Sequence, residues 1–243
     1  MRVKEWMVTD LITVTPQTPL LRATKEMKRH NIRRLPVVDQ DGSLVGIVTD
    51  RDLKAAGPSK VTTLDVHEQF YLFGELTVSD IMTPDPVTIT PHETVEKAAV
   101  VMLSLKISGL PVVDQGKPVG IITQDDISRV LTEITGVFYG GVQLALYLPD
   151  TGESLSRVTD LLTAHGCRAV SVLCINDIQP ENVCKAYIRV SEDELDRLQP
   201  VIDHLQELGQ FRYVAQDSLD LQYRRQMEAE QSHGPDKSSK IPH

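Results

Sequence analysis

The sequence predicts a mixed α/β protein of the α+β type, in which a doubled unit is followed by a smaller βαββαβ unit. The doubling is explicit: MVTDLITVTP at 7–16 returns as MTPDPVTITP at 82–91, and LPVVD at 35–39 returns at 110–114. The third motif, GIVTDRD at 46–52, becomes GIITQDD at 120–126. A long period that occurs only twice indicates two similar supersecondary units related by a pseudo-twofold axis, and not an extended solenoid.

The first repeat is expected to run strand, helix, strand, strand, helix. Residues 12–15 alternate as a short strand, and Pro16–Pro19 precede a helix. Residues 35–38 and 44–48 predict two strands, because they are short apolar runs rich in β-branched residues. Between them, Asp41-Gly42 predicts a hairpin turn.

A short helix over 50–56 is expected to close the first repeat, since Gly57-Pro58 would end it. The second repeat has the same order, with Gln115-Gly116 in the turn and a helix over 124–134. Between the repeats, residues 57–76 have weak periodicity and are interpreted as a linker.

The pattern changes after Gly136. Strands are expected over 142–148, 168–175, 185–190 and 211–215. A helix is expected near Leu155–Leu162, and a second over 192–208, where Ser191 and Glu194 suit a capping box. This βαββαβ order is typical of the ferredoxin-like arrangement. The charged segment 218–243 predicts a disordered tail.

Composition restricts the classes of function. The chain has 243 residues and a net charge of −9, which argues against sequence-independent binding of nucleic acid. No apolar run approaches the ~20 residues that cross a bilayer, and the first residues lack the apolar segment of a signal peptide. We therefore expect a cytoplasmic protein with no nucleic-acid or membrane partner. Cys167 and Cys174 bracket an apolar run and are expected to be buried core thiols.

Catalytic motifs are not found in the sequence. The histidines match no metal-ligand spacing, and neither a Walker A motif nor G-x-S-x-G occurs. The carboxylate pair Asp125-Asp126 stands at neighbouring positions of a predicted helix, where the two side chains point in different directions. We therefore expect no enzyme activity, no catalytic residue, no metal site and no prosthetic group.

The two Thr-Pro turns, the two LPVVD strands and the two G-x-x-T-x-x-D segments resemble the CBS domain, and the tandem pair resembles a Bateman module. The resemblance covers residues 1–135, with one CBS unit over about 1–56 and the other over about 77–135. In their βαββαβ order and in the turn at 150–155, residues 137–217 resemble an ACT domain, a small-ligand regulatory module. ACT domains often show the pattern D-x-x-G-x-L at this turn, and this chain has one extra residue between Gly152 and Leu155. A CBS pair followed by an ACT-like domain resembles the bacterial acetoin-utilisation regulators.

The T-x-x-D segments have two possible roles, ligand binding and helix capping. Thr49 and Thr123 each end a strand and open a helix, where free backbone N–H groups and the helix dipole favour an anion such as phosphate. Asp52 and Asp126 stand one turn on and are able to accept hydrogen bonds from a ribose diol. Gly46 and Gly120 would leave room for a ligand. The alternative is a helix capping box, in which Thr and Asp only satisfy backbone donors, and both roles can coexist.

The resemblance implies two binding sites for an adenine nucleotide (AMP, ADP or ATP), each shared across the pseudo-twofold axis. Site A would join Ile47, Thr49 and Asp52 to Thr90, Ile107, Ser108 and Gly109. Site B would join Ile121, Thr123 and Asp126 to Thr15, Ile32, Arg33 and Arg34. For Arg33 and Arg34, the alternative is an exposed helix end whose basic residues complement the dipole.

The function expected from these features is regulatory ligand sensing. The CBS pair would bind an adenine nucleotide, and the ACT-like domain would dimerise the chain or bind an amino acid or another small effector. A homodimer is expected, with a partner enzyme as a further possible ligand. The alternative function is a structural adaptor whose sites are empty and whose surface binds a partner enzyme.

Overall fold

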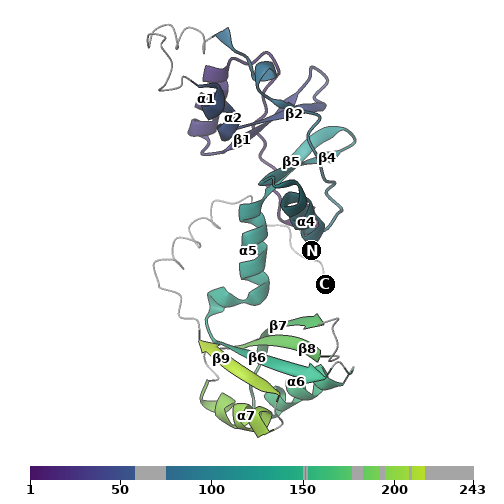
Figure 1. Ribbon diagram of the computed structural model, residues 1–243, viewed down its shortest axis with the longest axis vertical. Coiled ribbons are helices and arrows are strands. Elements are labelled where there is room, and N and C mark those ends of the chain that lie inside the picture. Colours follow the sequence, from purple (N-terminus) through teal and green to yellow (C-terminus); the bar gives the residue numbers. More distant parts are fainter. Residues whose placement is uncertain are drawn as a thin grey trace, which may run out of the picture. The chain divides into compact units, whose positions relative to one another are not determined.

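The computed structural model describes residues 1–57, 75–149, 151, 153–176, 183–191, 195–207 and 210–216. The expected linker core at 58–74, Asp150, Gly152, Glu194 and the tail at 218–243 lie outside the described residues. The chain divides into two compact units, Met1–Ile127 and Ser128–Gly234. Figure 1 traces both along the chain.

The first repeat follows the expected order of elements. Helix α1 (Leu20–Arg29) is followed by the hairpin of β1 (Arg34–Val38) and β2 (Leu44–Thr49), and then by α2 (Asp50–Ala56). Gly42 in the hairpin turn has a φ of +79°, a conformation that glycine adopts without strain. The strand expected over residues 12–15 is reduced to one bridge, in which Val14 pairs with Val37.

The second repeat copies the first. Helix α4 (Val95–Leu105) precedes the hairpin of β4 (Gly109–Asp114) and β5 (Lys117–Thr123), which leads into α5 (Gln124–Thr135). Gly116 in its turn also has a φ of +79°. Two short 3-10 helices, η1 (Val3–Glu5) and η2 (Val78–Asp80), open the two repeats and were not expected from the sequence.

The opening segment of each repeat is attached to the other repeat. The backbone N–H of Val3 donates to the carbonyl of Glu93 at 2.9 Å, and Val8 pairs with Ile121. In return, the N–H of Val78 donates to Thr18 O at 2.9 Å, and β3 (Thr83–Pro84) pairs with β2. The exchange is reciprocal, so the two repeats form one unit.

The apolar core of the first repeat also contains a residue from the exchanged segment of the second repeat. The core of the first repeat contains Leu20 and Met27 from α1, Leu35 from β1 and Val48 from β2, together with Val78 from the opening segment of the second repeat. All five have an exposed fraction of 4% or less. Burial of these apolar side chains stabilises the first repeat together with the opening segment of the second.

The second unit has the βαββαβ order that the sequence predicts. Its elements are β6 (Val142–Pro149), α6 (Ser154–Ala164), β7 (Ala169–Asn176), β8 (Val183–Val190), α7 (Leu195–Glu207) and β9 (Phe211–Gln216), after a short 3-10 turn η3 (Val137–Tyr139). The sheet order is β7-β8-β6-β9, and every pairing is antiparallel. This is the ferredoxin-like arrangement.

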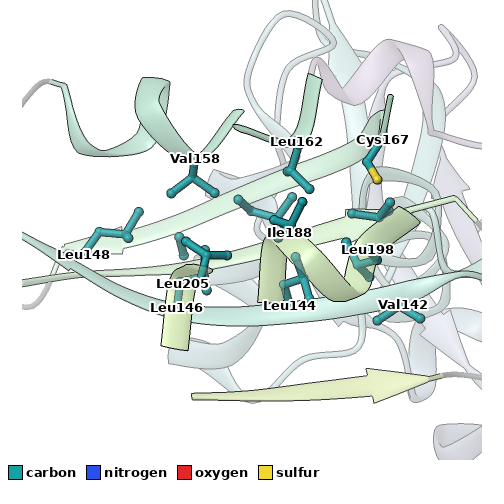
Figure 2. Close-up of a cluster of buried hydrophobic side chains, with 13 residues drawn as sticks. Val142, Leu144, Leu146, Leu148, Val158, Leu162, Cys167, Ile188, Leu198 and Leu205 are labelled. Atoms are coloured by element: carbon teal, nitrogen blue, oxygen red, sulfur yellow. The ribbon is translucent and has the colours of Figure 1, made fainter. Parts of the chain in front are cut away.

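Helices α6 and α7 cover one face of this sheet (Figure 1). Figure 2 shows the core between them, where Val158 and Leu162 of α6 and Leu198 and Leu205 of α7 meet the apolar side chains of β6 and β8, such as Ile188. Cys167 belongs to this core, as expected. The expectation for Cys174 is wrong, because this thiol lies exposed on β7, at the edge of the sheet.

Among the described residues, no helix has the length and apolar character that crossing a membrane requires.

Candidate functional site

Two helices of the first unit begin at the predicted T-x-x-D segments. The N–H and Oγ1 of Thr49 donate to Asp52 Oδ2 at 2.8 and 2.7 Å, and the N–H of Asp52 donates back to Thr49 Oγ1 at 3.3 Å. For Thr123 and Asp126, the corresponding distances are 2.8, 2.6 and 3.3 Å. Both segments therefore make the contacts of capping boxes, and the nucleotide-binding role of the same residues stays a prediction.

A third segment makes the same contacts outside the predicted sites. Thr77 donates from its N–H and Oγ1 to Asp80 Oδ2 at 2.7 and 2.9 Å, at the start of η2. These hydrogen bonds lower the pKa of the Asp80 carboxyl. The pattern T-x-x-D by itself thus predicts a cap, and only its surroundings distinguish Asp52 and Asp126. One such difference is burial, since Asp126 is only 3% exposed.

The hydroxyl hydrogens of the two threonines are already used. Thr49 Oγ1 donates to Asp52, and Thr123 Oγ1 donates to Asp126. A hydroxyl has only one hydrogen to donate. A phosphate at either helix start would accept from a threonine only if that hydrogen left the carboxylate. The hydrogen bonds from Thr49 converge on one oxygen of Asp52, Oδ2.

The space above the two glycines is filled by methionines. A Cβ on Gly46 would lie 2.6 Å from the sulfur of Met82, and a Cβ on Gly120 would lie 2.5 Å from the sulfur of Met7. The expectation that these glycines leave room for a ligand is therefore wrong at the Cβ position. Each methionine is the first residue of one copy of the longest repeated motif, and this shared position is the sequence signal for the contact.

The predicted site residues differ in exposure. On the surface lie Thr15, Arg33, Thr90 and Ser108. Partly buried are Ile32, Arg34, Ile47, Thr49, Asp52, Ile107, Gly109 and Thr123. Buried are Ile121 and Asp126.

Arg34 is the residue at which the two predicted sets meet. Its Nη2 donates to Ser108 Oγ at 2.8 Å, and its Nη1 would lie 2.3 Å from a Cβ on Gly109. Burial lowers the pKa of the Arg34 guanidinium, whereas the charges of Asp125, Asp126 and Asp50 raise it. A residue assigned to site B thus contacts two residues assigned to site A.

The Thr-Pro turns carry a difference in charge that sequence reasoning missed. The N–H of Thr15 donates to the neutral Thr18 Oγ1 at 3.0 Å. At the equivalent turn, the N–H of Thr90 donates to Glu93 Oε2 at 2.8 Å. Hydrogen bonds from Lys97 and from the Thr90 N–H lower the pKa of Glu93. Site A therefore has a carboxylate in its turn where site B has a hydroxyl.

Within the described ranges, no group of three His, Cys, Asp or Glu side chains is arranged to hold a metal ion.

Comparison with known proteins decides the family. The model of the CBS domain matches residues 3–58 and 78–133. A CBS domain-containing protein of Dictyostelium discoideum is 38% identical over 133 residues, which is 54% of this chain and 92% of that protein. The chain belongs to the CBS-domain family. The two matched segments correspond to the two repeats, so the first unit is a tandem CBS pair.

Some relatives are enzymes that contain a CBS pair. Inosine-5′-monophosphate dehydrogenase of Korarchaeum cryptofilum is 36% identical over 127 residues, which is 52% of this chain but only 23% of the enzyme. The similarity to this enzyme therefore concerns about a quarter of its length.

Solved structures of CBS pairs are also similar to this chain. The CBS pair of protein MJ0100, in complex with 5′-methylthioadenosine and S-adenosyl-L-methionine, is 34% identical (55% of this chain, 97% of that one, TM-score 0.46). CBSX2 in complex with AMP is 32% identical (55% and 97%, TM-score 0.46). A putative acetoin utilization protein, AcuB, of Vibrio cholerae is 29% identical (56% and 94%, TM-score 0.47).

Proposed function

We propose that this CBS-domain protein is a regulatory sensor of an adenine nucleotide, which binds at the two T-x-x-D helix starts of the CBS pair. The observation that carries the proposal is the position of Arg34, a partly buried cation whose charge is close to Asp126 and whose head contacts Ser108. A guanidinium at a helix start suits a phosphate, because the dipole and the fork of N–H donors act on the same anion.

The aspartates would provide the other half of recognition. Asp52 and Asp126 accept from their threonines, and a carboxylate has further acceptor positions for a ribose diol. Capping and ribose binding are therefore compatible in one side chain. Apolar residues such as Ile47 and Ile121 would contact the adenine ring.

The second unit would have a separate role. Its ferredoxin-like topology is compatible with an ACT-like domain that dimerises the chain or binds a small effector, such as an amino acid. One face of its sheet carries Tyr147, over which Arg212 stacks at 4.3 Å from the ring centre. Together with the CBS pair, such a domain would suit a cytoplasmic regulator, as the resemblance to acetoin-utilisation regulators implies.

Calorimetry on the intact chain tests the proposal. AMP, ADP, ATP and S-adenosylmethionine are the probes, since AMP and S-adenosylmethionine are bound in the complexes of similar CBS pairs. We expect saturable binding of at least one probe and a rise in the melting temperature, because a ligand of the folded state stabilises it. Absence of binding by all four would favour the alternative, an adaptor whose empty sites leave its surface to bind a partner enzyme.

A further inference from the structure

Arg34 and Gly109 occupy equivalent positions in the two repeats, because each directly precedes its LPVVD strand. The strands also pair equivalently, since Arg34 lies opposite Thr49 and Gly109 lies opposite Thr123. If both repeats had an arginine at this position, the pair would carry two guanidinium groups there. This chain has a guanidinium at position 34 only, since position 109 is glycine.

The single guanidinium lies over the glycine that replaces the other. A Cβ on Gly109 would come within 2.3 Å of Arg34 Nη1 and 2.8 Å of its Cζ. The Nη2 donates to Ser108, the residue before Gly109. Arg34 therefore extends from its own repeat onto the equivalent strand of the other, and Gly109 leaves the space for its head.

The charges around Arg34 come from both helix starts. Asp125 and Asp126 belong to the first turn of α5, and Asp50 belongs to the first turn of α2. Burial lowers the pKa of the Arg34 guanidinium, and the charges of these three carboxylates raise it. Backbone geometry agrees, because the N–H of Asp50 donates to Arg33 O at 2.9 Å and the N–H of Gln124 donates to Ser108 O at 3.2 Å. These are the helix starts at which the two ligands of the proposed function would place their phosphates.

We propose that Arg34 is a cation shared by both nucleotide sites, so that binding of an anionic ligand at one site weakens binding of an anionic ligand at the other. This inference rests on the proposed function and specifies its regulation. The first phosphate attracts the guanidinium, and the second phosphate then meets a like charge without the help of Arg34. Adenosine has no charged phosphate that attracts the guanidinium, so its binding at one site is independent of its binding at the other.

Calorimetry of the intact chain with AMP and adenosine measures this coupling. Ile47→Trp and Ile121→Trp would block site A and site B without changing any charge, so that each variant binds one ligand. For independent sites, the product of the two stepwise association constants of the unmodified chain equals the product of the two single-site constants. We expect the product for AMP to be about tenfold smaller, within the range of allosteric couplings, and the product for adenosine to be unchanged.

Arg34→Gln is introduced into the unmodified chain and into both blocked variants. The product of the two stepwise association constants for AMP should then equal the product of the two single-site constants. Arg22→Ala is the control, because it removes an exposed positive charge on α1 outside both predicted sites and should leave the coupling intact. Gly109→Ala is the second variant, since it retains every charge but displaces the guanidinium, and it should reduce the coupling.

Three results decide between the hypotheses. If AMP binds at both sites with the product expected for independence, or if only one site ever binds AMP, the shared cation is wrong and the proposed function stands. If none of AMP, ADP, ATP, adenosine and S-adenosylmethionine binds, both fall. If the unmodified chain binds only one AMP although each blocked variant also binds one, then occupation of either site prevents binding at the other. That result would be the strongest form of the coupling.

Discussion

Met82 lies directly over Gly46, with its sulfur 2.6 Å from where a Cβ would stand. Met7 has the same relationship to Gly120 in the other repeat, at 2.5 Å. Because the opening segments are exchanged between the repeats, both contacts join one repeat of the CBS pair to the other. Neither glycine has positive φ, so the lack of space, and not backbone strain, requires glycine here.

Replacing either glycine should therefore destabilise the CBS pair. We expect Gly46→Ala and Gly120→Ala each to lower the free energy of unfolding by about 1–3 kcal/mol, the usual effect of overpacking. Gly57→Ala is the control, because a Cβ there meets its nearest atom at an ordinary 3.4 Å. Urea unfolding measures all three. Equal stability of all three variants would show that the methionines move aside without cost.

Asp52, Asp126 and Asp80 separate capping from ligand binding, since all three accept the same two hydrogen bonds from a threonine. Asp52→Ala and Asp126→Ala should each lower stability by about 0.5–2 kcal/mol. They should also weaken one nucleotide site by about 1.5–3 kcal/mol, the value of hydrogen bonds to charged groups.

Asp80→Ala is the matched control, with its cap lost and its nucleotide affinity intact. Calorimetry and denaturation on the same variants provide both readouts. Unchanged affinity in all three variants would mean that capping is the whole role of the motif.

The cap at Asp80 should depend on pH. Its pKa is lowered in the folded protein by hydrogen bonds from Thr77, so the contribution of the carboxylate is present above the ordinary pKa of aspartate. That contribution is lost as the pH falls from about 4 through the lower, folded value. Thermal unfolding between pH 7 and pH 2 should show a smaller acid-induced loss of stability in Asp80→Asn than in the unmodified chain. Parallel curves would contradict this.

Site B should prefer ligands with more phosphates. The cations assigned to site B are Arg33 and Arg34, whereas the turn of site A carries the carboxylate of Glu93. Arg33→Ala should reduce the affinity for ATP more than that for AMP, and Glu93→Gln should raise the affinity of site A for ATP. Titrations at two salt concentrations check both, because screening weakens the ATP contacts most. If neither variant changes the ratio of ATP to AMP affinity, this ranking of the sites is wrong.

We expect an apolar face of α4 to be buried in the interface of a homodimer. Val100 and Leu103 are 61% and 73% exposed, which is unusual for side chains that lie close together on one helix. Light scattering at micromolar concentration should give a dimer mass. Leu103→Asp should shift the equilibrium toward the monomer, whereas Val87→Asp, at an exposed loop position, should not. A monomer in the unmodified chain would refute the isologous interface.

The sequence by itself determined the features that depend on local interactions. The repeat predicted the two hairpins and helix α2 over Asp50–Ala56, because turns, caps and strand pairs involve residues close together in the chain. The Thr–Asp boxes belong to this class, since each joins residues three positions apart. The βαββαβ order of the second unit was equally accessible from its periodicity.

Tertiary structure alone decided how the repeats complete one another. The strand expected near Val14 became a single bridge to Val37, because its backbone hydrogen bonds are made with the distant Pro36 and Val38. Arg34 is hydrogen-bonded to Ser108, 74 residues away. No local pattern directs a flexible side chain across a pseudo-twofold axis. Its direction depends on the space left by Gly109 and on the hydroxyl of Ser108.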